Sequence, residues 1–168
     1  PEVTVNPDGT GTIKKHYCLG RFARELVEVM PDNKTVLMGD DYTGGGLFMF
    51  IADKEGDLSS GTLYGAKFTQ TAATNGGTFT LAWIKLGSAT SAEIEALANT
   101  SSPSDILDVR FSDPSDSSFT QMALDGGGYQ WVKVLPTKTK AATFLETHRF
   151  AAISGVSMEL TKLEGVSH

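Results

Sequence analysis

The sequence contains little cysteine, little charge and no long apolar run. A single cysteine among 168 residues cannot form an internal disulfide or supply a zinc site built from several thiolates. Every apolar stretch is shorter than the roughly 18 to 20 residues that a membrane-spanning helix requires. Asp and Glu (20) outnumber Lys and Arg (14), which gives a formal net charge of −6. We therefore expect no transmembrane segment and no nucleic-acid partner.

Several catalytic signatures are also missing. The chain has no Gly-x-Gly-x-x-Gly loop, no Walker phosphate loop and no Gly-x-Ser-x-Gly nucleophile turn. The three histidines, His16, His148 and His168, lack the His-Glu-x-x-His spacing, so we expect them in packing or surface roles. Cys18 lies among apolar neighbours and is expected to be a buried, unreactive thiol.

Glycine is abundant instead, with 18 residues, and much of it forms three runs at 44–46, 76–77 and 126–128. Because no phosphate-binding motif surrounds them, these runs predict turns that need positive φ angles or close backbone approach. Asp40 and Asp41 precede the first run. We interpret them as turn residues, with binding of a hard cation through their oxygens as the alternative.

Short apolar stretches separated by turn residues predict a mainly β fold of antiparallel strands. The segment Pro31-Asp32-Asn33-Lys34 has the composition of a hairpin turn, and residues 53–60 are expected to form a polar loop. The expected strands cover residues 26–30, 35–38, 47–51, 62–68, 78–84 and 130–135. Turn signals roughly every 8–12 residues favour a sandwich, a barrel or a propeller.

Two helices are expected to interrupt the strands. Thr90 and Glu93 have the spacing of a capping box at the start of the first helix, 90–98. The second helix is expected over 139–153, where apolar residues share one face. The Ser-, Asp- and Pro-rich segment 99–118 between them is expected to be a mobile loop.

Two carboxylates lie beside basic residues. Glu25 follows Arg21 and Arg24 closely, and Lys162 and Glu164 share one side of an extended strand because side chains alternate. From the residues alone, such pairs are surface ion pairs, which contribute little to stability.

A series of short blocks, in order along the chain, resembles the PhoX-type alkaline phosphatase family. The blocks are residues 19–25 (LGRFARE), 36–41 (VLMGDD), 47–50, 61–68, 83–87, 144–152 and 158–165. Members of this family are secreted phosphomonoesterases with a β-propeller fold and a cluster of iron and calcium ions. The resemblance implies that this chain forms two to three propeller blades with one or two inserted helices.

The same resemblance implies three site residues. Glu25 and Glu164 fall on metal-ligand positions, and Lys162 falls where the family has a basic residue that contacts phosphate. Calcium and iron(III) prefer carboxylate oxygens, and a neighbouring ammonium would stabilise charge on the transferring oxygens. Two positions depart from the pattern, since Arg24 stands in place of an expected His and Lys162 in place of an Arg.

The chain also lacks family segments that complete such a site, including an upstream Thr-Cys-Glu-Glu segment, to which Cys18 is not equivalent. We therefore expect residues 1–168 to be one excised unit of a larger propeller, secreted or periplasmic by resemblance. The parent is expected to hydrolyse phosphate monoesters with calcium and iron, whereas the fragment is expected to be inactive and need not bind metal.

The alternative is a non-catalytic β-propeller or β-sandwich binding module. Exposed strand edges would favour self-association.

Overall fold

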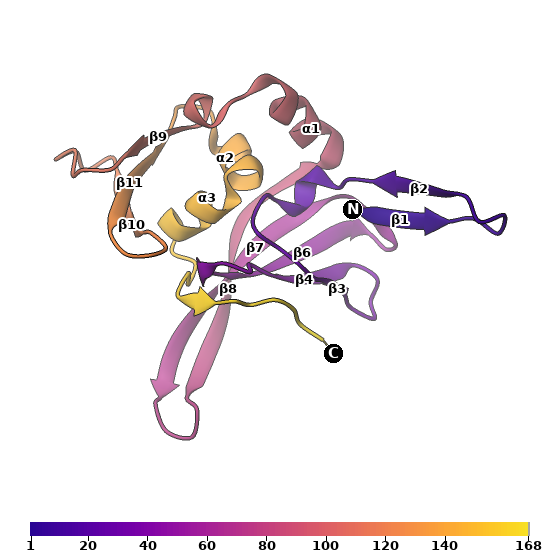
Figure 1. Cartoon of the computed structure of the whole chain (residues 1–168), viewed down its shortest axis with the longest axis horizontal. Helices are drawn as coiled ribbons and strands as arrows, with labels where there is room; N and C mark the ends of the chain where they lie inside the picture. Colours follow the sequence, from indigo (N-terminus) through magenta and orange to yellow (C-terminus); the bar gives the residue numbers. More distant parts are fainter. Residues whose placement is uncertain (168) are drawn as a thin grey trace.

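A five-stranded antiparallel sheet is the largest element of the computed structural model, which describes residues 1–167 (Figure 1). Its strand order is β3-β4-β6-β7-β8, so each strand pairs with its neighbours by short connections or hairpins. The strands are β3 (Val27–Val29), β4 (Thr35–Gly39), β6 (Leu47–Lys54), β7 (Asp57–Ala72) and β8 (Thr78–Thr90). β3 and β8 are the two edges of this sheet.

The side chains of one face of this sheet build the main core. In β6, Phe48, Phe50 and Ala52 are buried, whereas the residues between them are partly or fully exposed. Val36 and Met38 of β4 lie directly opposite Phe50 and Phe48 and are also buried. This period of two places the fully buried apolar side chains of the pair on the same face, which sets the register.

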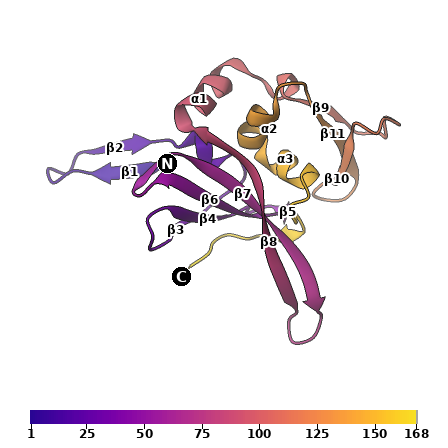
Figure 2. The same ribbon diagram turned by 180° about the vertical axis from the view of Figure 1, so that it is seen from behind.

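The remaining strands form three smaller sheets. One is a hairpin of β1 (Glu2–Val5) and β2 (Gly11–Lys14), and another pairs β5 (Thr43–Gly45) with β12 (Leu160–Thr161). The third has the order β10-β11-β9, from β10 (Thr120–Ala123), β11 (Tyr129–Val134) and β9 (Leu107–Arg110). Seen from behind, the β1–β2 hairpin and the tip of the β7–β8 hairpin project away from the body (Figure 2).

Three helices cover the cores: α1 (Ser91–Thr100), α2 (Thr139–Leu145) and α3 (Thr147–Ile153). α2 and α3 lie between the large sheet and the three-stranded sheet (Figure 1). Phe144 and Ala151 pack into the main core, whereas Ala141 and Ala142 pack against Val132 of β11 in a second core. The helices therefore join the two sheets into one body.

The expected mainly β, antiparallel fold with inserted helices is confirmed. The capping box is also confirmed, because Thr90 Oγ1 accepts a hydrogen bond from Glu93 N and the Glu93 carboxylate accepts one from Thr90 N. Over residues 1–167 the strands form open sheets, with no closed barrel or propeller. The propeller stays a prediction.

Three local expectations were wrong. The polar segment 53–60 is the tight end of the β6–β7 hairpin rather than a loop, since β6 ends at Lys54 and β7 begins at Asp57. The segment 99–118 contains the end of α1, a 3-10 turn at 103–105 and the whole of β9, although its mobility stays a prediction. The single helix expected over 139–153 is broken at Glu146, which has φ −127° and ψ 41°.

Candidate functional site

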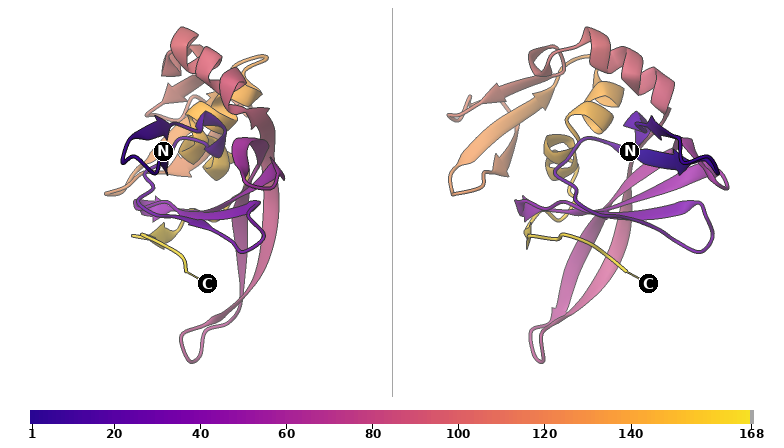
Figure 3. Two further views of the ribbon diagram at one scale, coloured as in Figure 1. Left: turned by 90° about the vertical axis from the view of Figure 1, so that its right-hand side faces the viewer. Right: turned by 45° about the vertical axis from the view of Figure 1, so that its right-hand side comes forward.

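The last strand carries the C-terminal segment across the end of β4. β12 pairs with β5, with Leu160 opposite Gly45, and the Lys162 N–H then donates to the carbonyl of Tyr42 at 3.2 Å. A side chain at Gly39 would overlap the carbonyl oxygen of Leu163, so glycine permits this close crossing. Figure 3 shows the C-terminal segment and α1 on opposite sides of β4. The crossing places residues 162–164 beside the turn that follows β4.

Lys162 and Asp41 form an ion pair at this crossing. The Lys162 Nζ lies 3.1 Å from Asp41 Oδ1, a buried oxygen that accepts no hydrogen bond of good geometry among the described residues. The Asp41 carboxylate raises the pKa of Lys162, and the charges of Glu164 and Glu25 add to this effect. The Lys162 backbone has φ 57°, a left-handed conformation that is uncommon outside glycine. Such conformations often occur at functional sites.

The structure thus brings together the three residues that the resemblance implied. Glu25 and Glu164 both lie close enough to Lys162 for their charges to shift its pKa. A side chain at Gly165 would overlap Leu26, so the residues that follow the two glutamates also pack together. Both glutamates are exposed. Within residues 1–167, no group of three or more His, Cys, Asp or Glu side chains is arranged to hold a metal ion.

A second group of polar residues surrounds the neighbouring Asp40. This side chain is fully buried, and its Oδ1 accepts a hydrogen bond from the backbone N–H of Ala23 at 3.0 Å. Its Oδ2 lies 2.7 Å from Nδ1 of His148, a residue of α3. The second ring nitrogen of His148, Nε2, does not contact this carboxylate oxygen. Tyr42 packs edge-on against the imidazole at 5.4 Å between ring centres. A carboxylate in this position fixes the orientation and tautomer of the imidazole.

Glu146 lies at the bottom of the same region. This buried carboxylate accepts a hydrogen bond from Arg149 Nη1 at 2.5 Å and lies 3.6 Å from Arg21 Nη1. Arg149 Nε also donates to Gln130 of β11 at 3.4 Å. With Asp40 and His148, these side chains line a cavity of about 340 Å³. Each buried carboxylate of this cavity already has a cationic or imidazole partner, so its charged groups are paired with one another.

Sequence reasoning missed this second group and part of the first. The sequence favours a turn role for Asp41, with cation binding as the alternative, and a packing or surface role for His148, and it indicates no partner for either residue. No signal within the sequence links His148 to Asp40, because the two lie 108 positions apart. Cys18 is fully buried, as expected, and His16 is also buried. His168 lies outside the described residues.

The chain was compared with protein-family models, with curated proteins and with solved structures. None of them matches it. No helix within residues 1–167 is both long enough and apolar enough to cross a membrane.

Proposed function

We propose that this chain is part of a metal-dependent phosphomonoesterase of the PhoX-like type, in which Glu25 and Glu164 bind the cation and Lys162 contacts phosphate. One observation carries the proposal: Gly165 lies so close to Leu26 that a side chain there would overlap it, which brings together the segments that carry Glu164 and Glu25 from opposite ends of the chain. The resemblance had selected these three residues without any knowledge of their distances. Their convergence is what a shared site requires.

Asp41 adds a third carboxylate to this cluster, which we name the crossing cluster: Glu25, Asp41, Lys162 and Glu164. These three carboxylates supply the hard oxygen donors that calcium and iron(III) prefer, but within residues 1–167 they are not already arranged around one cation position. In this proposal they close on the cation when it binds. A bound cation would polarise a phosphoryl oxygen. Lys162 would stabilise negative charge on that group as a point charge, because an ammonium lacks the two-pronged geometry of a guanidinium.

In this proposal the two sheets are parts of a larger propeller. Sequential antiparallel neighbours, as in β6, β7 and β8, are the pattern of propeller blades, whereas the order β10-β11-β9 departs from it. The parent protein would act on phosphate monoesters in a secreted or periplasmic setting, which rests on the resemblance alone. Further ligands would come from parts of the parent beyond this chain.

Cation binding by the chain itself tests the proposal first. Terbium(III), a luminescent substitute for calcium, should be sensitised by Tyr42, which directly follows Asp41 in the sequence. We expect luminescence that calcium competes away, and at least tenfold weaker binding in the Glu25→Gln/Glu164→Gln double variant. Glu95→Gln, an exposed change on α1, is the matched control and should bind terbium normally. Equal affinity in the double variant and the wild type would refute the assignment of the ligands.

Hydrolysis tests the activity separately. The longer protein that contains this segment should hydrolyse p-nitrophenyl phosphate with calcium and iron, whereas the chain alone should not. A parent that is inactive under every metal condition would refute the phosphatase proposal, whatever the terbium result.

A further inference from the structure

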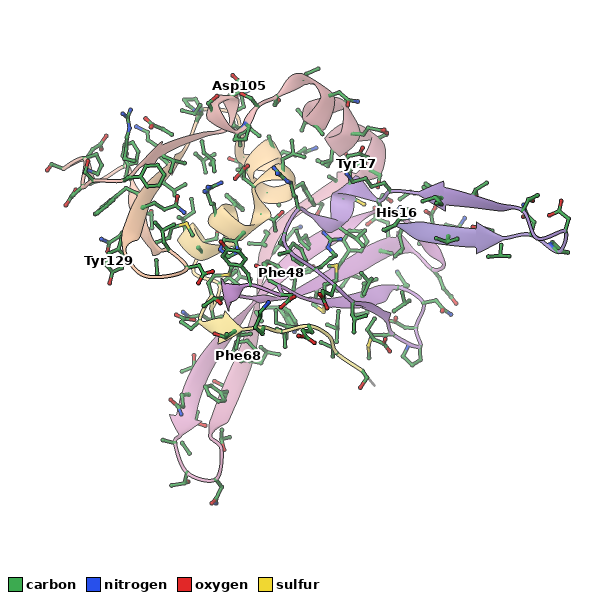
Figure 4. All side chains as sticks on the ribbon, in the orientation of Figure 1. His16, Tyr17, Phe48, Phe68, Asp105 and Tyr129 are labelled. Atoms are coloured by element: carbon green, nitrogen blue, oxygen red, sulfur yellow. The ribbon has the colours of Figure 1, made fainter. Side chains whose placement is uncertain are left out.

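A second, larger cavity adjoins the cavity beside His148, and the two share Arg21, Phe22, Leu145 and Glu146 in their linings. It has a volume of about 1030 Å³, at the upper end of the roughly 300–1,000 Å³ that ligand sites occupy. Its walls come from the β1–β2 hairpin, the segment 15–29 and the ends of α1 and α2. His16 and Tyr17, labelled in Figure 4, lie where the hairpin joins the body.

The mouth of this cavity is apolar. Ile13, Leu26, Val27 and Val29 all line it, with exposed fractions of 76%, 57%, 42% and 42%. Phe144 and Leu19 continue the apolar lining toward the core, where both are buried. Exposed apolar residues gathered at a cavity, rather than scattered, are typical of a binding site.

Arg24 places a cation in this apolar cavity. Its Nη2 donates to the carbonyls of Leu19 and Gly20, and its guanidinium lies 4.4 Å from the ring centre of Phe22. Among residues 1–167 it has no carboxylate within ion-pair distance, and its Nε and Nη1 groups have no acceptor. A partly buried guanidinium without a counter-ion can pair with an anion that enters the cavity.

We propose that this cavity binds a small amphipathic carboxylate, whose head group pairs with Arg24 and whose apolar body fills the space between β3, the β1–β2 hairpin and Phe144. A monoanion is favoured over a phosphate dianion because the Glu25 carboxylate, which lines the same cavity as Arg24 and Lys15, repels additional negative charge. Glu25 is common to this cavity and to the crossing cluster, but carboxylate binding needs no cation and so does not depend on the proposed phosphatase activity.

Calorimetric titration with decanoate tests the proposal, with decanol and decyl phosphate as comparison ligands. We expect one decanoate per chain, at least tenfold weaker binding of decanol, and weaker binding of decyl phosphate, because a charge-assisted hydrogen bond supplies at least a tenfold difference. Arg24→Gln should weaken decanoate binding at least tenfold. The matched control Arg110→Gln removes an exposed guanidinium that pairs with Asp108, outside this cavity, and should have no effect.

A second pair of variants tests the cavity independently, in case Arg24→Gln does not fold. Ile13→Asp and Val5→Asp change equally exposed positions of the same hairpin, 76% and 73%, but only Ile13 lines the cavity. Decanoate binding should fall in Ile13→Asp and persist in Val5→Asp. The proposal is overturned if decanol binds as tightly as decanoate, or if the two hairpin variants bind decanoate with equal affinity. It is also overturned if sedimentation shows a dimer that decanoate does not dissociate, since a second copy of the chain would then cover the cavity.

Discussion

Asp40 Oδ2 and His148 Nδ1 lie 2.7 Å apart and connect the turn after β4 to helix α3. The other oxygen of the same carboxylate holds the backbone N–H of Ala23. One fully buried side chain therefore ties together three segments that are distant in the sequence. Since Asp41 follows directly, this anchoring also fixes the neighbour of Lys162.

Asp40→Ala should destabilise the chain by about 2–3 kcal/mol, because it leaves a buried N–H and an imidazole without their charged acceptor. Chemical denaturation followed by circular dichroism measures the loss. Asp53→Ala, on the exposed end of β6, is the control and should change stability by less than about 0.5 kcal/mol. A stability of Asp40→Ala within 0.5 kcal/mol of the wild type would show that the buried carboxylate has no anchoring role.

The stability of α1 should depend on pH through Glu93. Hydrogen bonds from Lys140 first, and then from Thr90, lower the pKa of Glu93 from 4.5 to about 2. Because the folded-state pKa is the lower one, Glu93 stabilises the fold above about pH 4.5, and this contribution disappears as the pH falls toward 2. The melting temperature of the wild type should therefore exceed that of Glu93→Gln at pH 6, and the gap should narrow at pH 2.

Glu95→Gln, an exposed position in the same helix, provides the comparison for this titration. Its melting temperature should follow that of the wild type across the same range. A gap between the wild type and Glu93→Gln that stays constant from pH 6 to pH 2 would assign the effect of Glu93 to side-chain shape rather than to charge.

Local patterns predicted the local parts of this fold. Thr90 and Glu93 lie three residues apart, and the capping box depends on that spacing alone. The hairpin at 31–34 was predictable for the same reason, since Asp32 accepts hydrogen bonds from the backbone of Lys34 and Thr35. At 53–60 the same composition misled, because a hairpin end with exposed polar side chains has the composition of a loop.

Tertiary contacts account for what the sequence could not predict. The expected single helix breaks at Glu146, where Thr147 Oγ1 donates to the carbonyl of Thr143 at 2.6 Å and accepts from the N–H of Arg21. A hydroxyl that bonds back to the preceding turn bends helices, and apolar periodicity does not reveal it. Likewise, the resemblance selected Glu25, Lys162 and Glu164, whereas the sequence offered cation binding by Asp41 only as an alternative to a turn role and gave no link to Lys162.

Cys18 should be chemically silent in the folded chain. Burial raises the pKa of its thiol, and its sulfur lies 3.2 Å from both the carbonyl of Leu58 and Oγ of Ser91. Only the thiolate reacts with disulfide reagents, so both accessibility and ionisation oppose the reaction. Labelling with Ellman's reagent at pH 7.5 should be at least about 100-fold slower than in denaturant. Equal rates in the two conditions would show that this part of the core opens readily.

Gly39→Ala tests whether the backbone crossing at Leu163 organises the crossing cluster. The new methyl group would overlap the Leu163 carbonyl oxygen, and a backbone atom can give way only if residues 162–164 move. Stability should fall by about 1–3 kcal/mol, as for overpacking in a core. Terbium affinity should fall at least tenfold, although no proposed ligand is changed.

Gly126→Ala is the control, because its φ of 79° strains an alanine while the surrounding space is open. It should lower stability by about 1 kcal/mol and leave terbium binding intact. If Gly39→Ala binds terbium as tightly as Gly126→Ala, the close approach of β4 to the C-terminal segment does not position Glu164 for cation binding.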